Sequence, residues 1–407
     1  MSSERCDDAE PVVTPLVAAE FRLAAACAVW PHMGIAVGER VSPELDWKKF
    51  LRIVKRHRIG GLVYRALTKL PSVAGVPVNV QEALSLEATR IATHNLRLAA
   101  EAVRIDRLMA QSNINAAFLK GTALAKLAYN DIGVRHSKDV DLLIPPQSLE
   151  VAMGVLTDAG YRVSHPRGLR PSHLPWLKRV NHHIALVHPV RRTEVELHWR
   201  VTRNPRMLPD LPAPESWIAV EIAHGTALRT FPVHDLILYL CAHGAGHCWF
   251  RMKWLVDIAL LIAPMRESEL RALLRHAADV GMIRPLAQAL LLASSILALP
   301  LPPVLVKELD DGRAVRLLVK AAATAMYRID EPYDVPFGTA SMSLTQYLLR
   351  ADWHYIREQL IVHLGNQDDW HTVRLPPSLM FLYPLLRVPL WVGRQLKASA
   401  HDQTVRE

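Results

Sequence analysis

Two aspartates, Asp139 and Asp141, lie two residues apart at the start of a short apolar run in this 407-residue chain. If residues 140–144 form a β-strand, side chains two apart point to the same face, so both carboxylates share one side of it. Neighbouring carboxylates repel each other unless a cation neutralises them, and Mg²⁺ prefers oxygen ligands of this kind. The spacing therefore indicates a divalent-metal site, although aspartates that only shape a turn before a strand give the same pattern.

A second candidate site precedes the aspartates, where Lys120 and Gly121 stand at an expected junction between a strand and a helix. Glycine at such a junction lets backbone N–H groups approach a phosphate, and the N-terminus of the helix adds positive potential. The hydroxyl of Thr122 offers another donor, while Arg135 and Lys138 lie just upstream of the aspartates. A metal-bound triphosphate needs this combination, with carboxylates on the metal and donors and cations on the phosphoryl oxygens.

A third group of polar side chains occupies alternate positions further along the chain, at Glu194, Glu196 and His198. In a strand over 193–199 these three would share one face, and the apolar residues between them would share the other. One of the glutamates would complete a two-metal site, in which one ion activates the attacking oxygen and the other stabilises the leaving group. A half-exposed edge strand with a polar outer face gives the same alternation, so both interpretations stay open on spacing alone.

Histidines supply further candidates for the cleft. His243 and His247 are four residues apart in a predicted helix, so both rings can face one side of it and contact a metal or a phosphate. No HExxH pattern is present, which argues against a zinc protease. The two histidines would line the cleft or, like the tryptophans nearby, tie this helix to the rest of the chain through buried contacts. The pair His182-His183 precedes a predicted strand without a partner pattern, and we assign it no site.

The elements that must position these residues alternate between strand and helix in one stretch of the chain. Strands are predicted over 115–119, 140–144, 161–163, 183–188 and 193–199, with helices over 121–129 and 148–159. Before this stretch, helical spacing predicts a helix in 44–66 that ends at Gly60-Gly61, and one or two helices over 80–112. Helices return from residue 232. We therefore predict an α+β fold with a small mixed β-sheet core, and the expected parts are an N-terminal helical region, the core and a C-terminal helical domain at 1–112, 113–232 and 233–407.

The composition is that of a globular protein, because half of the residues are apolar and 21% are charged. The net charge of +9 suits a phosphate-bearing partner but does not distinguish a nucleotide from a nucleic acid or a membrane surface. Four cysteines without a CxxC motif, and a start that lacks the features of a secretory signal, predict a reducing, cytoplasmic location. Prolines interrupt the apolar run at 287–306, so we expect no integral membrane segment. A peripheral membrane role stays open for the apolar, arginine-dotted segment 375–396.

In combination, these motifs resemble the polymerase-β-like nucleotidyltransferase superfamily, and more narrowly a bacterial group named only as nucleotidyltransferase family proteins. The resemblance rests on Lys120-Gly121 opening a helix, on DVDLLI at 139–144 and on VELHW at 195–199. Asp46-Trp47 and the segment HGAGHCWFRMKWLVDIALL that begins at His243 match the narrower group. The matched segments span roughly residues 45–262, and each motif is weak alone but specific in this order.

The resemblance implies a metal site for Mg²⁺, or for Mn²⁺ in its place, held by Asp139, Asp141 and Glu196 with Glu194 in reserve. It gives Gly121 a phosphate-cradling role and has Thr122 where the family usually has Gly or Ser. The implied reaction moves an NMP group from an NTP, with ATP the first choice, to an acceptor hydroxyl and releases pyrophosphate. The acceptor would be a small molecule, a peptide or a protein. Two alternatives stay open, a tRNA-directed enzyme that uses the positive charge and a catalytically silent nucleotide-binding module.

Overall fold

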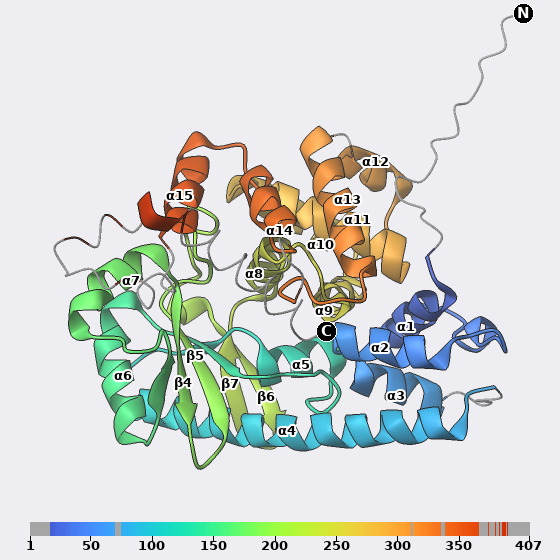
Figure 1. Cartoon of the computed structure of the whole chain (residues 1–407), viewed down its shortest axis with the longest axis horizontal. Coiled ribbons are helices and arrows are strands. Elements are labelled where there is room, and N and C mark those ends of the chain that lie inside the picture. The colour runs from blue at the N-terminus through green and yellow to red at the C-terminus, as the bar shows by residue number, and fades with distance from the viewer. Residues whose placement is uncertain are drawn as a thin grey trace, which may run out of the picture.

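The computed structural model describes residues 17–69, 75–310, 312–334 and 338–365, together with 373, 379, 382, 385–387 and 389. Helices come first, a sheet follows and helices return (Figure 1), so the predicted α+β class with a mixed sheet between helical regions is confirmed. Most of the segment 375–396, for which we left a membrane role open, lies outside the described residues. Within the described residues, no helix has the length and apolar character needed to cross a membrane.

Four helices precede the sheet: α1 (Ala19–Val29), α2 (Trp47–His57), α3 (Gly60–Lys69) and α4 (Val78–Gln111). The Asp46 side chain caps α2 by accepting a hydrogen bond from the backbone N–H of Lys49 at 3.0 Å. The prediction that a helix ends at Gly60-Gly61 is wrong, because α2 ends at His57 and the glycines begin α3. A side chain at Gly61 would collide with the backbone carbonyl of Val134, so this glycine allows close packing instead of breaking a helix.

The central sheet has five strands: β1 (Ala117–Phe118), β2 (Val140–Leu143), β3 (Arg162–His165), β4 (His183–His188) and β5 (Thr193–His198). Their order is β1-β2-β5-β4-β3, and only the β2–β5 pair is parallel. In register, Asp141 lies opposite Glu196 across the parallel pair, and His183 lies opposite His198 across β4–β5. The topology therefore brings three separate polar segments to neighbouring positions on one sheet.

The two faces of this sheet have different environments because side chains alternate along each strand. Val140 and Leu142 of β2, with Val195 and Leu197 of β5, share a hydrophobic core with α4 and with α6 (Leu149–Asp158) and α7 (Leu174–Val180). In Figure 1, α4 runs along the underside of the molecule, and it packs against α3, α6 and α5 (Gly121–Tyr129). The acidic side chains are left on the opposite face, toward the C-terminal helices.

A two-stranded hairpin of β6 (Ile218–Ala223) and β7 (Thr226–Thr230) follows the sheet and was not predicted. Gly225, with φ of +68°, supplies the left-handed conformation at its turn. The burial of β6 alternates, since Ile218, Val220 and Ile222 are half-buried or buried whereas residues 219, 221 and 223 are exposed. Two of the three exposed residues are alanines, so the sequence lacks the contrast between apolar and polar residues on which a strand prediction depends.

The C-terminal helices are α8 (Val233–Gly246), α9 (Met252–Ile262), α10 (Glu267–Asp279), α11 (Ile283–Leu297), α12 (Pro303–Asp310), α13 (Arg313–Tyr327), α14 (Ala340–Thr345) and α15 (Trp353–Leu364). Single turns of 3-10 helix lie at Gly38–Arg40, Pro146–Ser148, Pro171–His173, Pro214–Ser216 and Gln346–Leu348. Helix α1 packs against α9 and α11, so helices from both ends of the chain share one hydrophobic core. This packing holds the C-terminal helices over the polar face of the sheet (Figure 1).

Candidate active site

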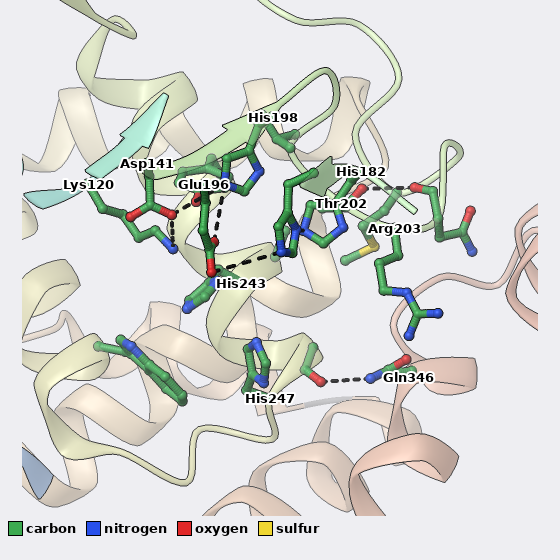
Figure 2. Close-up of a pocket in the computed structure, with 18 of the residues that line it drawn as sticks. Lys120, Asp141, His182, Glu196, His198, Thr202, Arg203, His243, His247 and Gln346 are labelled. Carbon is green, nitrogen blue, oxygen red and sulfur yellow. Dashed lines mark hydrogen bonds and ion pairs between the residues drawn. The ribbon is translucent and has the colours of Figure 1, made fainter. Parts of the chain in front are cut away.

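A cavity of about 700 Å³ lies between the polar face of the sheet and the helices α8, α9, α14 and α15. Its volume falls within the range of small-molecule pockets, about 300–1,000 Å³. Figure 2 shows Asp141 and Glu196 on the sheet side of this cavity and His243 and His247 on the helical side. Of the residues predicted from the sequence, all line the cavity except Thr122 and Glu194.

The acidic side chains gather where β2 and β5 run in parallel. Carboxylate oxygens of Asp139, Glu194 and Glu196 lie within 4.8 Å of one another, and one ligand atom each from Asp141, Glu196 and His198 does the same. Glu196 belongs to both groups and lies opposite Asp141 in the strand register. Between the two glutamates that the sequence left open as a third carboxylate, Glu196 is the one on the cavity wall.

The charges around this cluster are incompletely balanced. Burial, followed by the negative charges of Asp141 and Glu196, raises the pKa of Asp139 to about 6. Burial also opposes ionisation of Asp141 and Glu196, but Lys120 beside the first and His198 beside the second hold the pKa of each below its ordinary value. Lys138 Nζ lies 3.9 Å from Asp139 Oδ2, but this exposed ammonium and Lys120 only partly offset burial and the neighbouring acids. A bound cation would relieve the remaining repulsion between the acids.

Lys120 forms a buried ion pair with one of these acids, since its Nζ lies 2.8 Å from Asp141 Oδ1. Burial disfavours the ammonium, but Asp141 and the neighbouring acids more than offset this effect and raise the pKa of Lys120 well above its ordinary value. Gly121 begins α5 with φ of +63°, and a Cβ there would lie 3.7 Å from the carbonyl oxygen of Asp139. Glycine is thus favoured where the helix start approaches the aspartates. Thr122 is buried away from the cavity wall.

The two other predicted cations have different environments. The buried guanidinium of Arg135 donates from Nε and Nη2 to the two carboxylate oxygens of Asp257, each at 2.8 Å. Tyr129 donates to the same carboxylate at 2.7 Å, so the charge of Arg135 is already compensated. Lys138 stays half-exposed at the cavity edge, with its Nζ 3.2 Å from Glu194. Of the two, Lys138 is the cation that can reach an anionic ligand.

Aromatic rings form the helical wall of the cavity. The ring centroids of His243 and His247 lie 4.8 Å apart, and Trp254 lies 5.1 and 5.3 Å from them. Burial, followed by the positive charge of Lys120, lowers the pKa of both histidines, that of His247 to about 4. Both rings are therefore neutral at pH 7. The tryptophans differ from each other, since Trp249 is fully buried whereas Trp254 lines the cavity.

The pair His182-His183, to which the sequence assigned no site, also lines the cavity. Its partner is His198, and the three ring centroids lie 4.4 to 5.3 Å apart. A sequence signal existed, because a β4–β5 hairpin with a short turn aligns the start of one strand with the end of the other. The amide-bearing residues Gln346 and Gln359 come from the last helical segments and had no recognisable signal.

A family model described as an uncharacterised nucleotidyltransferase matches residues 43–298, which is more than half of the chain. The match contains the sheet, the cavity residues of α8 and α9, and the 45–262 span of the resemblance seen in the sequence. It ends just after α11, so α14 and α15, which close the cavity, lie beyond it. No curated protein matches the chain.

Proposed function

Because this chain belongs to the uncharacterised nucleotidyltransferase family, we propose that it transfers an NMP group from an NTP to an acceptor hydroxyl and releases pyrophosphate. The observation that carries this proposal is the position of Asp139, Asp141 and Glu196 together in one cavity, beside the glycine that begins α5. This arrangement supplies the two things that a triphosphate requires, a carboxylate site for its metal ion and backbone donors for its oxygens.

The carboxylate cluster fits a hard divalent ion such as Mg²⁺, with Mn²⁺ as a substitute. Its donors are oxygens, and burial, followed by the negative charges of Asp141 and Glu196, raises the pKa of Asp139 although Lys120 and Lys138 act in the opposite direction. We assign Asp139, Asp141 and Glu196 to the ion and leave Glu194 to its ion pair with Lys138. When bound, such an ion would offset charge on the phosphoryl oxygens of the nucleotide.

Basic side chains of the protein would keep the carboxylates of this cluster ionised. Lys120 keeps Asp141 ionised through their 2.8 Å ion pair, and His198 Nε2 lies 3.4 Å from both Asp141 and Glu196. The first N–H groups of α5, beginning at Gly121, have no acceptor within the helix and would offer donors to the phosphates. Lys138 is available for the remaining negative charge at the cavity edge, because its ion pair with Glu194 is exposed to solvent.

The aromatic wall supports the same assignment. His243, His247 and Trp254 present neutral ring faces and edges to the cavity, and nucleobases bind to such surfaces by stacking. We propose that this wall holds the base, with ATP as the first candidate. Amide side chains, including Asn204 and Gln359, also line the cavity and favour a polar acceptor such as a small molecule or a peptide side chain.

The test is a labelling experiment with the full chain. The protein is incubated with Mg²⁺, a cell extract and each of the four NTPs in turn, radiolabelled at the α-phosphate, and the labelled product is separated by size and class. We expect label in a small molecule or a protein band together with pyrophosphate. A labelled RNA band would support the tRNA-directed alternative instead.

The matched variants for this experiment are Asp139→Asn with Asp141→Asn, and Asp158→Asn as the control. Asp158 lies on the exposed end of α6, outside the cavity. Loss of two metal ligands should lower transfer by at least about 100-fold, since loss of a residue that only hydrogen-bonds to a metal ligand already lowers activity by about 10- to 100-fold. Transfer that survives in the double variant, or pyrophosphate release equal to that without protein, would refute the proposed reaction.

A further inference from the structure

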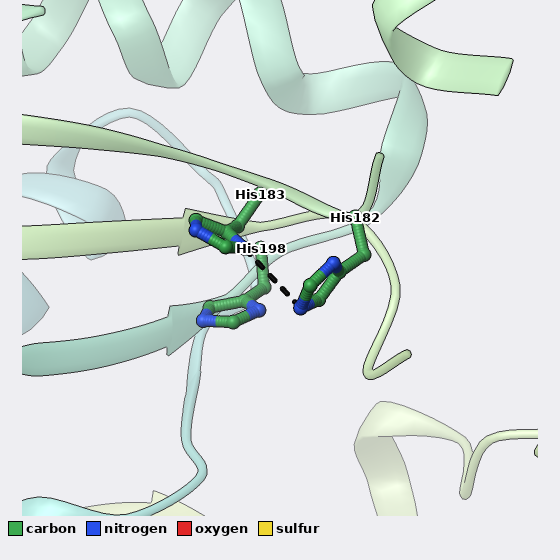
Figure 3. Close-up of side chains that lie close together, drawn as sticks. All are labelled: His182, His183 and His198. Atoms are coloured by element: carbon green, nitrogen blue, oxygen red, sulfur yellow. Dashed lines mark hydrogen bonds between the residues drawn. The ribbon is translucent and has the colours of Figure 1, made fainter. Parts of the chain in front are cut away.

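Three histidines meet on the sheet side of the cavity (Figure 3). His183 at the start of β4 is paired with His198 at the end of β5, and His182 comes just before β4. One ring nitrogen from each of the three lies within 4.8 Å of the other two. All three residues line the cavity, so a ligand that binds their nitrogens would be reachable from it.

The remote nitrogens of two of these rings face oxygen acceptors. His182 Nδ1 lies 3.2 Å from the side-chain oxygen of Asn181, and His183 Nε2 lies 3.9 Å from Glu196 Oε1. An N–H at each of these positions leaves a lone pair on the opposite nitrogen, which is Nε2 of His182 and Nδ1 of His183. Histidines that bind metals almost always donate their other N–H to an oxygen. The 3.2 Å contact of His182 has this geometry, while His183 Nε2 faces Glu196 at a longer distance.

His198 follows the same pattern. Its Nε2 lies 3.4 Å from Asp141 Oδ1 and 3.4 Å from Glu196 Oε2, so this nitrogen faces the carboxylates. Its Nδ1 is then the nitrogen on the side of His182 (Figure 3). Neither nitrogen of this buried ring has a hydrogen-bond partner among the residues that the structure describes. A buried polar atom without a partner is costly and calls for a ligand.

The spacing of the facing nitrogens also suits a metal ion. His182 Nε2 and His183 Nδ1 lie 3.2 Å apart. Two imidazole nitrogens bound tetrahedrally to Zn²⁺ at about 2.0–2.1 Å would lie about 3.3 Å apart. Without a metal, the two rings share one proton at this distance. With a metal, the proton of His183 would sit on Nε2, toward Glu196.

We propose that His182, His183 and His198 bind a transition-metal ion of the Zn²⁺ type, at a site beside the carboxylate cluster and distinct from it. Imidazole nitrogens select such ions, whereas an all-oxygen set selects Mg²⁺. Three protein ligands leave one coordination position open, as in catalytic zinc sites, and here it faces the cavity. Water or an oxygen or nitrogen atom of a bound molecule would occupy it. The site does not depend on the nucleotidyl transfer proposed above.

The test uses Co²⁺ as a spectroscopic substitute for Zn²⁺. The full chain is freed of metal with a chelator, dialysed into an excess of Mg²⁺ and titrated with Co²⁺ without nucleotide. We expect one equivalent to bind with the visible absorption of four-coordinate Co²⁺, and Zn²⁺ to displace it. His182→Gln and His183→Gln should each weaken binding by at least about 100-fold, more than the 10- to 100-fold contributed by residues behind metal ligands.

Two controls assign the ion to the histidines. Asp139→Asn removes a carboxylate but keeps the three rings, and His165→Gln removes another histidine of the cavity wall. Both control variants should bind Co²⁺ as the unchanged protein does. Zn²⁺ should raise the unfolding temperature of the unchanged protein and of both controls, but not that of His182→Gln or His183→Gln. Absence of stoichiometric Co²⁺ binding would overturn the proposal. So would binding that survives in both histidine variants or is lost in Asp139→Asn, because the ion would then lie at the carboxylates.

Discussion

Among the described residues, Glu196 is the one shared by the two acidic groups of the cavity. Its carboxylate belongs to the group with Asp139 and to the group with Asp141, and it lies 3.4 Å from His198. Glu194, two residues earlier on the same strand, lies outside the cavity wall and pairs with the half-exposed Lys138. The two glutamates differ in position but not in chemistry, which makes them a matched pair for assigning the third metal ligand.

Replacing each glutamate by glutamine separates their roles. Glu196→Gln should lower nucleotidyl transfer by at least about 100-fold. Loss of a residue that only hydrogen-bonds to a metal ligand lowers activity by about 10- to 100-fold, and loss of a ligand should cost more. Glu194→Gln should change it by no more than about fivefold, since an exposed ion pair contributes at most about 1 kcal/mol. Initial rates at saturating Mg²⁺ and NTP measure both. Equal losses in the two variants, or a larger loss for Glu194→Gln, would move the third ligand to Glu194.

For single residues, the sequence predicts which side chains share one face of a strand but not which side chains of different strands are neighbours. Alternation alone placed Glu194, Glu196 and His198 on one face. The choice between the glutamates needed the register of a parallel pair, which no local pattern encodes. His182-His183 were missed although the short β4–β5 turn offered a signal, because their partner His198 lies on the neighbouring antiparallel strand and not in the same local pattern.

Among the elements, α5 is the one whose start decides how a phosphate would bind. Gly121 holds φ of +63° at its first residue, close to the backbone of Asp139. Gly168 has nearly the same φ of +62° but is exposed in a loop with no atom near its missing Cβ. The two glycines therefore have the same left-handed backbone conformation in different surroundings, and a Cβ would introduce strain at both.

Alanine at these glycines tests whether the start of α5 binds phosphate. Both Gly121→Ala and Gly168→Ala should lower the free energy of unfolding by about 1–2 kcal/mol, the cost of a left-handed residue with a Cβ. Only Gly121→Ala should also weaken Mg-ATP binding, by about tenfold or 1.4 kcal/mol. Chemical denaturation and calorimetric titration measure the two quantities. An unchanged Mg-ATP affinity in Gly121→Ala would remove α5 from the phosphate site.

The bounds of helices and strands agree best with the prediction where the apolar residues recur with a clear period. The strand at His183–His188 and the helix at Gly121–Tyr129 have the predicted bounds. The prediction at Gly60-Gly61 was wrong because glycines that end a helix and glycines that allow close packing give the same sequence pattern. The contact of Gly61 with Val134 is visible only in the structure. The β6–β7 hairpin was missed because the alternating burial of β6 has alanines at two of its three exposed positions, which hides the pattern in the sequence.

In the whole molecule, long-range polar contacts fix the helices over the sheet. Arg135 and Asp257 join the segment before β2 to α9, and Lys253 donates to the carbonyl oxygen of His136 at 3.0 Å. Breaking such a buried pair leaves an unpaired charge, which costs about 3–5 kcal/mol. The sequence predicted a phosphate-binding role for Arg135. Its actual partner, Asp257, lies 122 residues away and cannot be recognised from sequence spacing.

The most direct test of the account is whether this cavity binds a triphosphate through a metal ion held by its carboxylates. Calorimetric titration of the full chain with a non-reacting ATP analogue, bridged by a methylene between the α- and β-phosphates, measures this without turnover. Binding should require Mg²⁺ and should weaken at least about tenfold in Asp139→Asn with Asp141→Asn, a loss of about 1.4 kcal/mol or more. Equal affinity with and without Mg²⁺, or in the double variant, would contradict the account.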